Sequence, residues 1–156
     1  MAASYFDAGS DMVETNSFGG SRYMLKKYDH GDRVEELNRK GAEHARAAAP
    51  AGRFVLGSIG PTGEFLEPNG TATEKEMYDV FVEQTRGLAA GGIDAFCIET
   101  MIDLAETAVA IRAAKETGLP VIATSTFDKG PRGYFTMMGV TPAGAAKQLS
   151  DAGADV

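Results

Sequence analysis

GGIDAFCIETM, from Gly91 to Met101, is the stretch of sequence that decides the fold. A glycine pair is followed by an aspartate, and an apolar run then closes on Glu-Thr. This order is typical of a helix that ends at glycine, a short turn, and a buried strand whose far end becomes polar. The same phrase occurs as AGSDMVETNSFG from Ala8 to Gly19, and it begins again as AGADV from Ala152 to Val156. We therefore expect the chain to repeat one helix–strand unit.

Four short apolar runs are the expected strands, and a fifth begins at Asp155. They cover residues 11–16, 54–58, 94–100 and 120–126. The runs are continuous rather than alternating, which is typical of parallel strands covered on both faces.

The third run also predicts what each of its faces packs against. Ala95, Cys97 and Glu99 share one face, because successive side chains of a strand point to opposite sides. The bulky Phe96 and Ile98 share the other. Small residues suit a crowded barrel interior, and bulky residues suit a helix-covered exterior.

Helical periodicity fills the intervals between these runs. The stripes that share a helix face are Val34, Leu37, Gly41 and Ala45; Met77, Val80, Phe81, Gln84 and Leu88; and Leu104, Ala108, Ile111 and Lys115. The predicted helix starts are a capping box at Thr73 and Glu76, an acidic analogue at Asp103 and Glu106, and an N-cap before a first-turn proline at Thr141 and Pro142.

Strict alternation of strands and helices predicts an α/β fold with right-handed crossovers. Both an open doubly wound sheet and part of a (βα)8 TIM barrel satisfy the pattern. A whole barrel needs about 250 residues. A chain of 156 residues would therefore supply four to five of its βα units.

Composition excludes several classes of protein. A net charge of −7 and a pI near 4.8 lack the basic surface that nucleic-acid binding requires. No apolar run is long enough to span a membrane, and the N-terminus has no pattern of a signal peptide. The single cysteine, Cys97, cannot form an internal disulfide, which predicts a cytoplasmic protein.

The carboxyl ends of the expected strands are polar, and ligands of α/β proteins bind beyond those ends. The ends lie at residues 14–17, 58–63, 99–100 and 124–126. Glu99 would stand at the mouth of a barrel, where its carboxylate could hold a substrate ammonium group. The alternative for Glu99 is a strand-end residue that caps the next helix or pairs with a neighbour.

Other motifs predict no chemistry. Residues 57–63 read GSIGPTG, which lacks the Lys-Ser/Thr of a phosphate-binding loop. Cys97, His30 and His44 have no spacing that joins them into a zinc site, so we expect no metal ligand in this chain. Residues 128–133 read as a mobile loop that could cover a barrel mouth.

Four segments resemble, in order, the homocysteine S-methyltransferase family. They are ETNSFGGSRYML, GSIGPTGEFLEP, IETMIDLAE and LPVIATSTFDKG, at residues 14–25, 57–68, 98–106 and 119–130. The resemblance implies a (βα)8 barrel in which zinc, held by three cysteines, binds homocysteine as a thiolate. The metal-bound thiolate then accepts a methyl group from a donor such as a methyl-corrinoid, carried by a partner domain or protein, or methylfolate.

The resemblance also implies roles for individual residues. Glu99 matches the carboxylate that binds the homocysteine amino group. The strand-end positions that match the rim of the substrate site are Thr15, Asn16, Ser58, Gly60, Thr126 and Phe127.

The family's first strand and its three zinc cysteines have no match, and Cys97 corresponds to none of these cysteines. We therefore expect residues 1–156 to be the central part of the barrel, inactive by itself. The alternatives are an inactive remnant that acts as an assembly partner, and a small open-sheet ligand-binding module.

Overall fold

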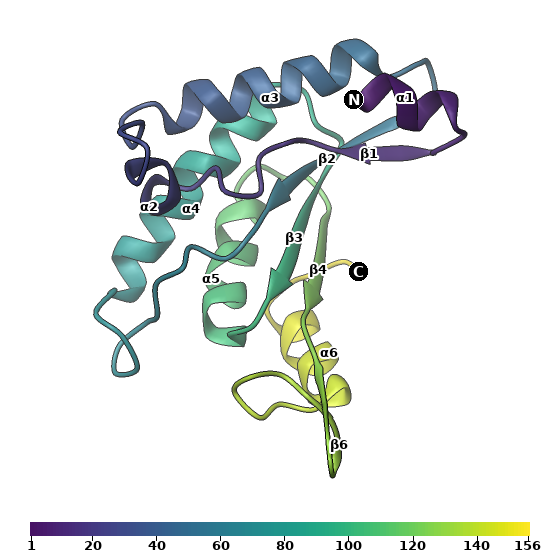
Figure 1. Cartoon of the computed structure of the whole chain (residues 1–156). Helices are drawn as coiled ribbons and strands as arrows, with labels where there is room; N and C mark the ends of the chain where they lie inside the picture. Colours follow the sequence, from purple (N-terminus) through teal and green to yellow (C-terminus); the bar gives the residue numbers. More distant parts are fainter.

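Four parallel strands form the main sheet of the computed structural model, which describes residues 1–156 (Figure 1). They are β1 (Met12–Glu14), β2 (Phe54–Ile59), β3 (Ala95–Met101) and β4 (Val121–Ser125), and they lie side by side in chain order. The predicted strands are confirmed, with ends displaced by one or two residues. The order never reverses about a central strand, so the doubly wound alternative is wrong.

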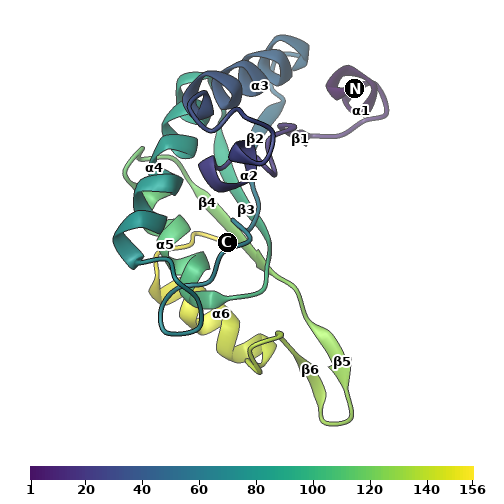
Figure 2. The ribbon, with the colours of Figure 1, turned by 60° about the vertical axis from the view of Figure 1, so that its left-hand side comes forward.

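Helices cover one face of this sheet (Figures 1 and 2). These are α3 (Val34–Ala48), α4 (Glu74–Ala90) and α5 (Leu104–Lys115), and α6 (Pro142–Asp151) packs against α5. The short helices α1 (Ala2–Asp7) and α2 (Arg22–Lys26) were not predicted. No helix packs over the opposite face within this chain, so the expectation of strands covered on both faces holds for one face only.

The hydrophobic core lies between the sheet and its helices. Phe96 and Ile98 of β3 are fully buried there, in one cluster with Phe81 of α4, as the alternation along β3 predicts. The predicted stripe of α4 is buried in full. The stripe of α5 was wrong at Lys115, which is exposed and pairs with Asp155 at the surface.

The repeated Gly-x-Asp phrase has a structural explanation. Gly92 and Gly153 have φ values of 86° and 105°, which let the chain turn from helix into strand without a steric penalty. The aspartate that follows each glycine accepts a hydrogen bond from a backbone N–H of the preceding strand. Asp94 Oδ2 lies 2.6 Å from Val55 N, and Asp155 Oδ2 lies 2.8 Å from Val121 N.

The expected fifth strand is present as a pair of backbone hydrogen bonds to β4. Asp155 N donates to Val121 O at 2.8 Å, and Ala123 N donates to Val156 O at 2.9 Å. These bonds place residues 155–156 along the edge of β4, in the position of the next parallel strand.

All three predicted helix starts are confirmed, but the predicted role of Glu106 at the start of α5 is wrong. Thr73 and Glu76 form the capping box, and Thr141 caps α6 before Pro142. At α5, Asp103 caps the helix by accepting from Ala105 N. The predicted partner Glu106 does not return to this cap and binds Thr62 instead.

The segment expected to be a mobile loop is a hairpin. β5 (Asp128–Gly130) pairs in antiparallel fashion with β6 (Gly133–Phe135), and the pair extends away from the sheet (Figure 2). Arg132 lies over the ring of Phe135 at 5.9 Å from its centroid. None of the helices is both long and apolar enough to cross a membrane.

Candidate functional site

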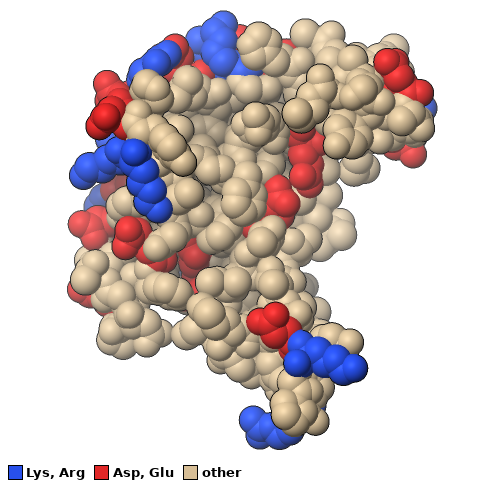
Figure 3. Space-filling model, in the orientation of Figure 1, with Lys and Arg blue, Asp and Glu red and all other residues tan.

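The open face of the sheet is hollowed and carries acidic side chains (Figure 3). Glu99 is the last residue of β3 whose side chain lies on this face. Cys97, two residues earlier, lies on the same face. Glu14, at the end of β1, is close enough to Cys97 to raise the pKa of its thiol. The predicted face of small and polar residues is therefore confirmed, and it is the face without helices.

Cys97 is a buried thiol between two carboxylates. Burial, together with the neighbouring carboxylates of Glu14 and then Glu99, raises its pKa to about 12. The thiol is therefore protonated at neutral pH. A nucleophile requires the thiolate, so Cys97 is not suited to that role.

Glu99 is half-buried and is held by one serine. Ser58 Oγ donates to Glu99 Oε1 at 2.5 Å, across from β2 to β3. No hydrogen bond of the structure reaches Oε2. Because Asp103 caps α5, the helix-cap alternative for Glu99 is wrong, while the bond to Ser58 is a pairing with a neighbour. The second carboxylate oxygen remains available to a cationic group in the hollow.

The backbone directly after Glu99 is strained. Thr100 has a φ of 61°, which is unusual for a β-branched residue and costs about 1–3 kcal/mol. The register shifts at the same place, since Ile98 pairs with Ala123 but Met101 pairs with Ser125. β3 thus has one extra residue, a β-bulge, and bulges often re-aim side chains next to active sites. Sequence reasoning missed the bulge, although the buried Met101 breaks the alternation that Glu99 begins.

Hydroxyl groups at the end of β1 hold the backbone of Ser58. Thr15 Oγ1 accepts from Ser58 N at 3.0 Å, and Ser17 Oγ donates to Ser58 O at 2.7 Å. The two hydroxyl oxygens also lie 2.6 Å apart. Thr15 is buried, so its hydroxyl is used inside the protein. The structure thus brings Thr15, Ser58 and Glu99 together, as the sequence predicted.

The other predicted residues lie along the same rim with different surroundings. Asn16 is exposed and lines a cavity of about 530 Å³ beside β1. Gly60 is covered by the ring of Phe18, which leaves no room for a Cβ atom. Thr126 is exposed, and Phe127 packs against the hydrophobic core. Of these four residues, Asn16 and Thr126 are the ones whose side chains are freely accessible.

A buried carboxylate behind the rim was not predicted as a functional group. Glu106 Oε1 accepts from Thr62 N at 2.7 Å and from Thr62 Oγ1 at 2.6 Å. Burial raises the pKa of Glu106, while the two bonds from Thr62 lower it and offset part of the effect. Glu106 therefore fastens the loop after β2 to the first turn of α5. The only sequence signal for Glu106 was its place three residues after Asp103 in the predicted capping pattern.

The described residues do not fit a zinc ion. Zinc sites in proteins use three or four converging Cys, His or carboxylate ligands. No group of three or more such side chains with the geometry for a metal occurs in this chain.

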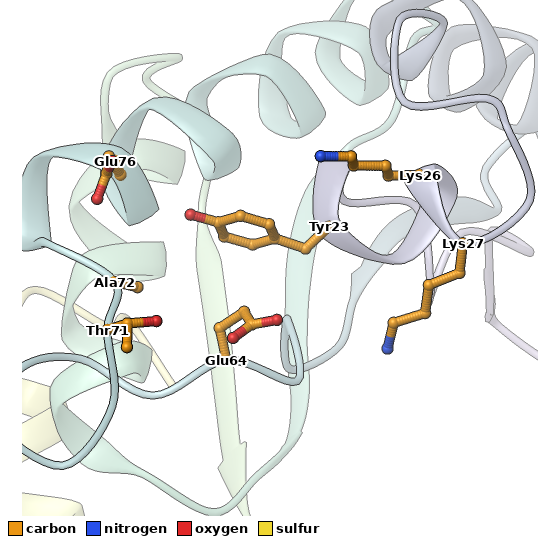
Figure 4. Close-up of a pocket in the computed structure, with 7 residues that line it drawn as sticks. All are labelled: Tyr23, Lys26, Lys27, Glu64, Thr71, Ala72 and Glu76. Carbon is orange, nitrogen blue, oxygen red and sulfur yellow. The ribbon is translucent and has the colours of Figure 1, made fainter.

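A second cavity lies outside the hollow face, between α2, the loop after β2 and the start of α4 (Figure 4). Its volume is about 490 Å³, and Tyr23 extends across it from α2. The lining residues are Tyr23, Lys26, Lys27, Glu64, Thr71, Ala72 and Glu76. Charges of both signs line this open cavity, and no buried polar group is directed into it.

Comparison with known proteins identifies a family. A family model described as homocysteine S-methyltransferase matches residues 1–156. The methionine synthase of Mycobacterium tuberculosis (strain ATCC 25618 / H37Rv) is 38% identical over 136 residues, which are 80% of this chain and 11% of that protein. The methionine synthase of Mycobacterium leprae (strain TN) is 36% identical over 117 residues, 71% of this chain and 10% of that protein. The chain thus spans about a tenth of the length of these relatives.

Solved structures agree on the fold. The metallated form of the homocysteine methyltransferase MmuM from Escherichia coli superposes with a TM-score of 0.76 at 17% identity. The superposition covers 97% of this chain and 58% of that one. The apo form gives a TM-score of 0.70 at 15% identity, over 97% and 55% of the two chains. At these identities the likeness concerns the fold alone.

Proposed function

The chain belongs to the homocysteine S-methyltransferase family, and we propose that it supplies the amino-acid-binding side of a barrel that methylates a thiol such as homocysteine. The observation that carries this proposal is the Glu99 carboxylate. It stands in the hollow at the end of β3, with one oxygen held by Ser58 and the other free of hydrogen bonds. A half-buried carboxylate in this position suits the ammonium group of an amino acid.

We further propose that residues 1–156 are the central part of a (βα)8 barrel, which we call the complete barrel. Support comes from the four strands in chain order and from a superposition that covers 97% of this chain but 58% of its structural neighbour. The open face would then be the barrel interior. The small and acidic residues of this face would line the substrate site, and the further strands would enclose it.

Zinc and the methyl donor belong, in this proposal, to parts outside the chain. The residues here lack a metal site, so any zinc that binds the thiol is held by ligands elsewhere in the complete barrel. The donor, a methyl-corrinoid or methylfolate, would be presented by another domain or protein. The contribution of this chain is to bind and orient the amino-acid end of the substrate. We place the protein in the cytoplasm, since its single cysteine forms no internal disulfide.

The test separates the amino group from the rest of the ligand. Homocysteine and 4-sulfanylbutanoate share a thiol and a carboxylate, but the second compound has no amino group. In the complete barrel, Glu99→Gln should raise the Kd for homocysteine about tenfold to a hundredfold, because a charge-assisted hydrogen bond is lost. The Kd for 4-sulfanylbutanoate should change less than about twofold, since that ligand makes no such bond. Both values come from isothermal titration calorimetry.

Two further variants act as controls. Glu67→Gln changes an exposed carboxylate outside the hollow and should leave both affinities unchanged. Glu14→Gln changes the other carboxylate beside Cys97. If Glu14→Gln weakens homocysteine binding and Glu99→Gln does not, the assignment of the ammonium site to Glu99 is wrong.

A further inference from the structure

Two features of the structure flank Glu99, one on each neighbouring strand. On the β2 side, Ser58 Oγ donates to Glu99 Oε1 at 2.5 Å. On the β4 side, Thr124 Oγ1 accepts from Thr100 N at 3.2 Å. Glu99 itself makes no bond to β4, so the second feature acts through the backbone of the residue that follows it.

The bulge places a backbone N–H where the regular ladder has no partner for it. Between Ile98 and Met101 the register skips, and the residues between them are unpaired in the sheet. Thr124 provides the missing acceptor through its side chain. The hydroxyl therefore stabilises a conformation that a threonine backbone rarely adopts, with φ at 61°. Strain of this kind persists only where its surroundings determine it, and it occurs mainly at functional sites.

The bulge also separates the two environments of β3. Up to Glu99 the alternation puts Cys97 and Glu99 on the hollow face. Without the extra residue, Met101 would share that face, yet it is fully buried in the core on the opposite side. The unusual backbone conformation of Thr100 puts the next side chain, that of Met101, on the opposite face of the strand. Glu99 can thus stay in the hollow while the chain enters the turn to α5.

We propose that Thr100, held in its left-handed conformation by the Thr124 hydroxyl, is a positioning residue that aims the Glu99 carboxylate at the substrate amino group. The proposal rests on the proposed role of Glu99. Thr100 and Thr124 touch no reacting atom. Their effect is on how well Glu99 is oriented before the ligand arrives, and a preoriented group loses less freedom on binding.

Thr124 provides the first pair of variants, measured in the complete barrel by calorimetry with homocysteine and 4-sulfanylbutanoate. Thr124→Val keeps the shape of the side chain and removes the acceptor oxygen. It should raise the Kd for homocysteine roughly threefold to tenfold, in line with the loss of one hydrogen bond. Thr124→Ser keeps the oxygen and should restore the wild-type Kd. The Kd for 4-sulfanylbutanoate should change less than about twofold in both.

Thr100 provides a second, independent pair. Thr100→Gly permits the left-handed conformation and many others, so it should weaken homocysteine binding in the same way without lowering the denaturant midpoint. Thr100→Asn is the matched control, because asparagine tolerates positive φ, and it should bind homocysteine like the wild type.

The outcomes separate this inference from the proposed function. If Thr124→Val or Thr100→Gly keeps the wild-type Kd for homocysteine while Glu99→Gln raises it, the positioning role is wrong and the role of Glu99 stands. If both ligands weaken equally in Thr124→Val, the residue supports the whole site, and the inference is also overturned. If Glu99→Gln itself leaves the Kd unchanged, the proposed function fails, and this inference fails with it.

Discussion

At the scale of single residues, the site is built from side chains that bind other parts of the protein. Ser58 N donates to the Thr15 hydroxyl, and Ser58 O accepts from the Ser17 hydroxyl. The Ser58 hydroxyl donates to Glu99. Behind it, Glu106 ties the loop that follows β2 through Thr62. The rim is therefore set by hydrogen bonds between strand ends, and the functional carboxylate is one member of that network.

Glu106 gives the stability of the barrel a dependence on pH. Burial raises the pKa of Glu106 above its ordinary value of 4.5. For a group whose folded pKa is raised, the stabilising contribution is present below the unfolded pKa and is lost as the pH rises through the folded pKa. Glu106→Gln keeps an acceptor oxygen for Thr62 and does not ionise. The free energy of unfolding of the wild type should therefore fall relative to this variant as the pH rises above the ordinary pKa of 4.5.

Urea denaturation of the complete barrel across this pH range measures the difference. Thr62→Val removes a hydroxyl whose hydrogen bond lowers the pKa of Glu106, so it should make the loss of stability with rising pH larger. A constant difference between wild type and Glu106→Gln at every pH would contradict the account, because the carboxyl would then titrate alike in folded and unfolded protein.

Whether the contacts of a residue could be predicted from the sequence depended on how far away in the sequence its partner lies. Alternation along β3 placed Cys97 and Glu99 on one face, because that pattern is local. The partner of Glu106 could not be predicted, because Thr62 lies 44 residues away in the sequence. The capping pattern instead predicted a contact with the nearby Asp103. The strain at Thr100 was missed for the same reason. It follows from pairing with β4 and from the burial of Met101.

At the scale of elements, side-chain caps define where the helices begin. The Thr73 hydroxyl accepts from Glu76 N, and the Glu76 carboxylate accepts from Thr73 N at 2.9 Å. Thr73→Ala removes one half of this capping box and should lower the free energy of unfolding by about 1 kcal/mol. Thr71→Ala, two residues earlier and also exposed, makes no cap and should change stability little. Equal effects of the two variants would show that the cap does not stabilise α4.

Long elements were predictable from sequence and short ones were not. The stripe of α4 from Met77 to Leu88 has enough turns to show its period, and all of it is buried. The hairpin of β5 and β6 has only three residues per strand, and its glycines indicated a loop. α2 has five residues, which is too few for a periodic pattern.

At the scale of the whole molecule, the open face determines how the isolated chain behaves. Apolar side chains are exposed along β1 and β2, among them Met12 at 46% and Phe54 at 49%. Exposed apolar surface and free strand edges favour association. We expect residues 1–156 alone to associate rather than remain a well-folded monomer, and to bind no stoichiometric zinc. Light scattering and metal analysis of the purified chain measure both, and a monodisperse monomer with one tightly held zinc would contradict the account.

The role proposed for Glu99 is to bind the amino group of the substrate. The most direct measurement is a crystal structure of the complete barrel with homocysteine bound. We expect the amino nitrogen to lie about 2.7–3.2 Å from a carboxylate oxygen of Glu99, with Ser58 Oγ still bonded to the other oxygen. An amino group held by other residues, with Glu99 bonded to Ser58 alone, would contradict it.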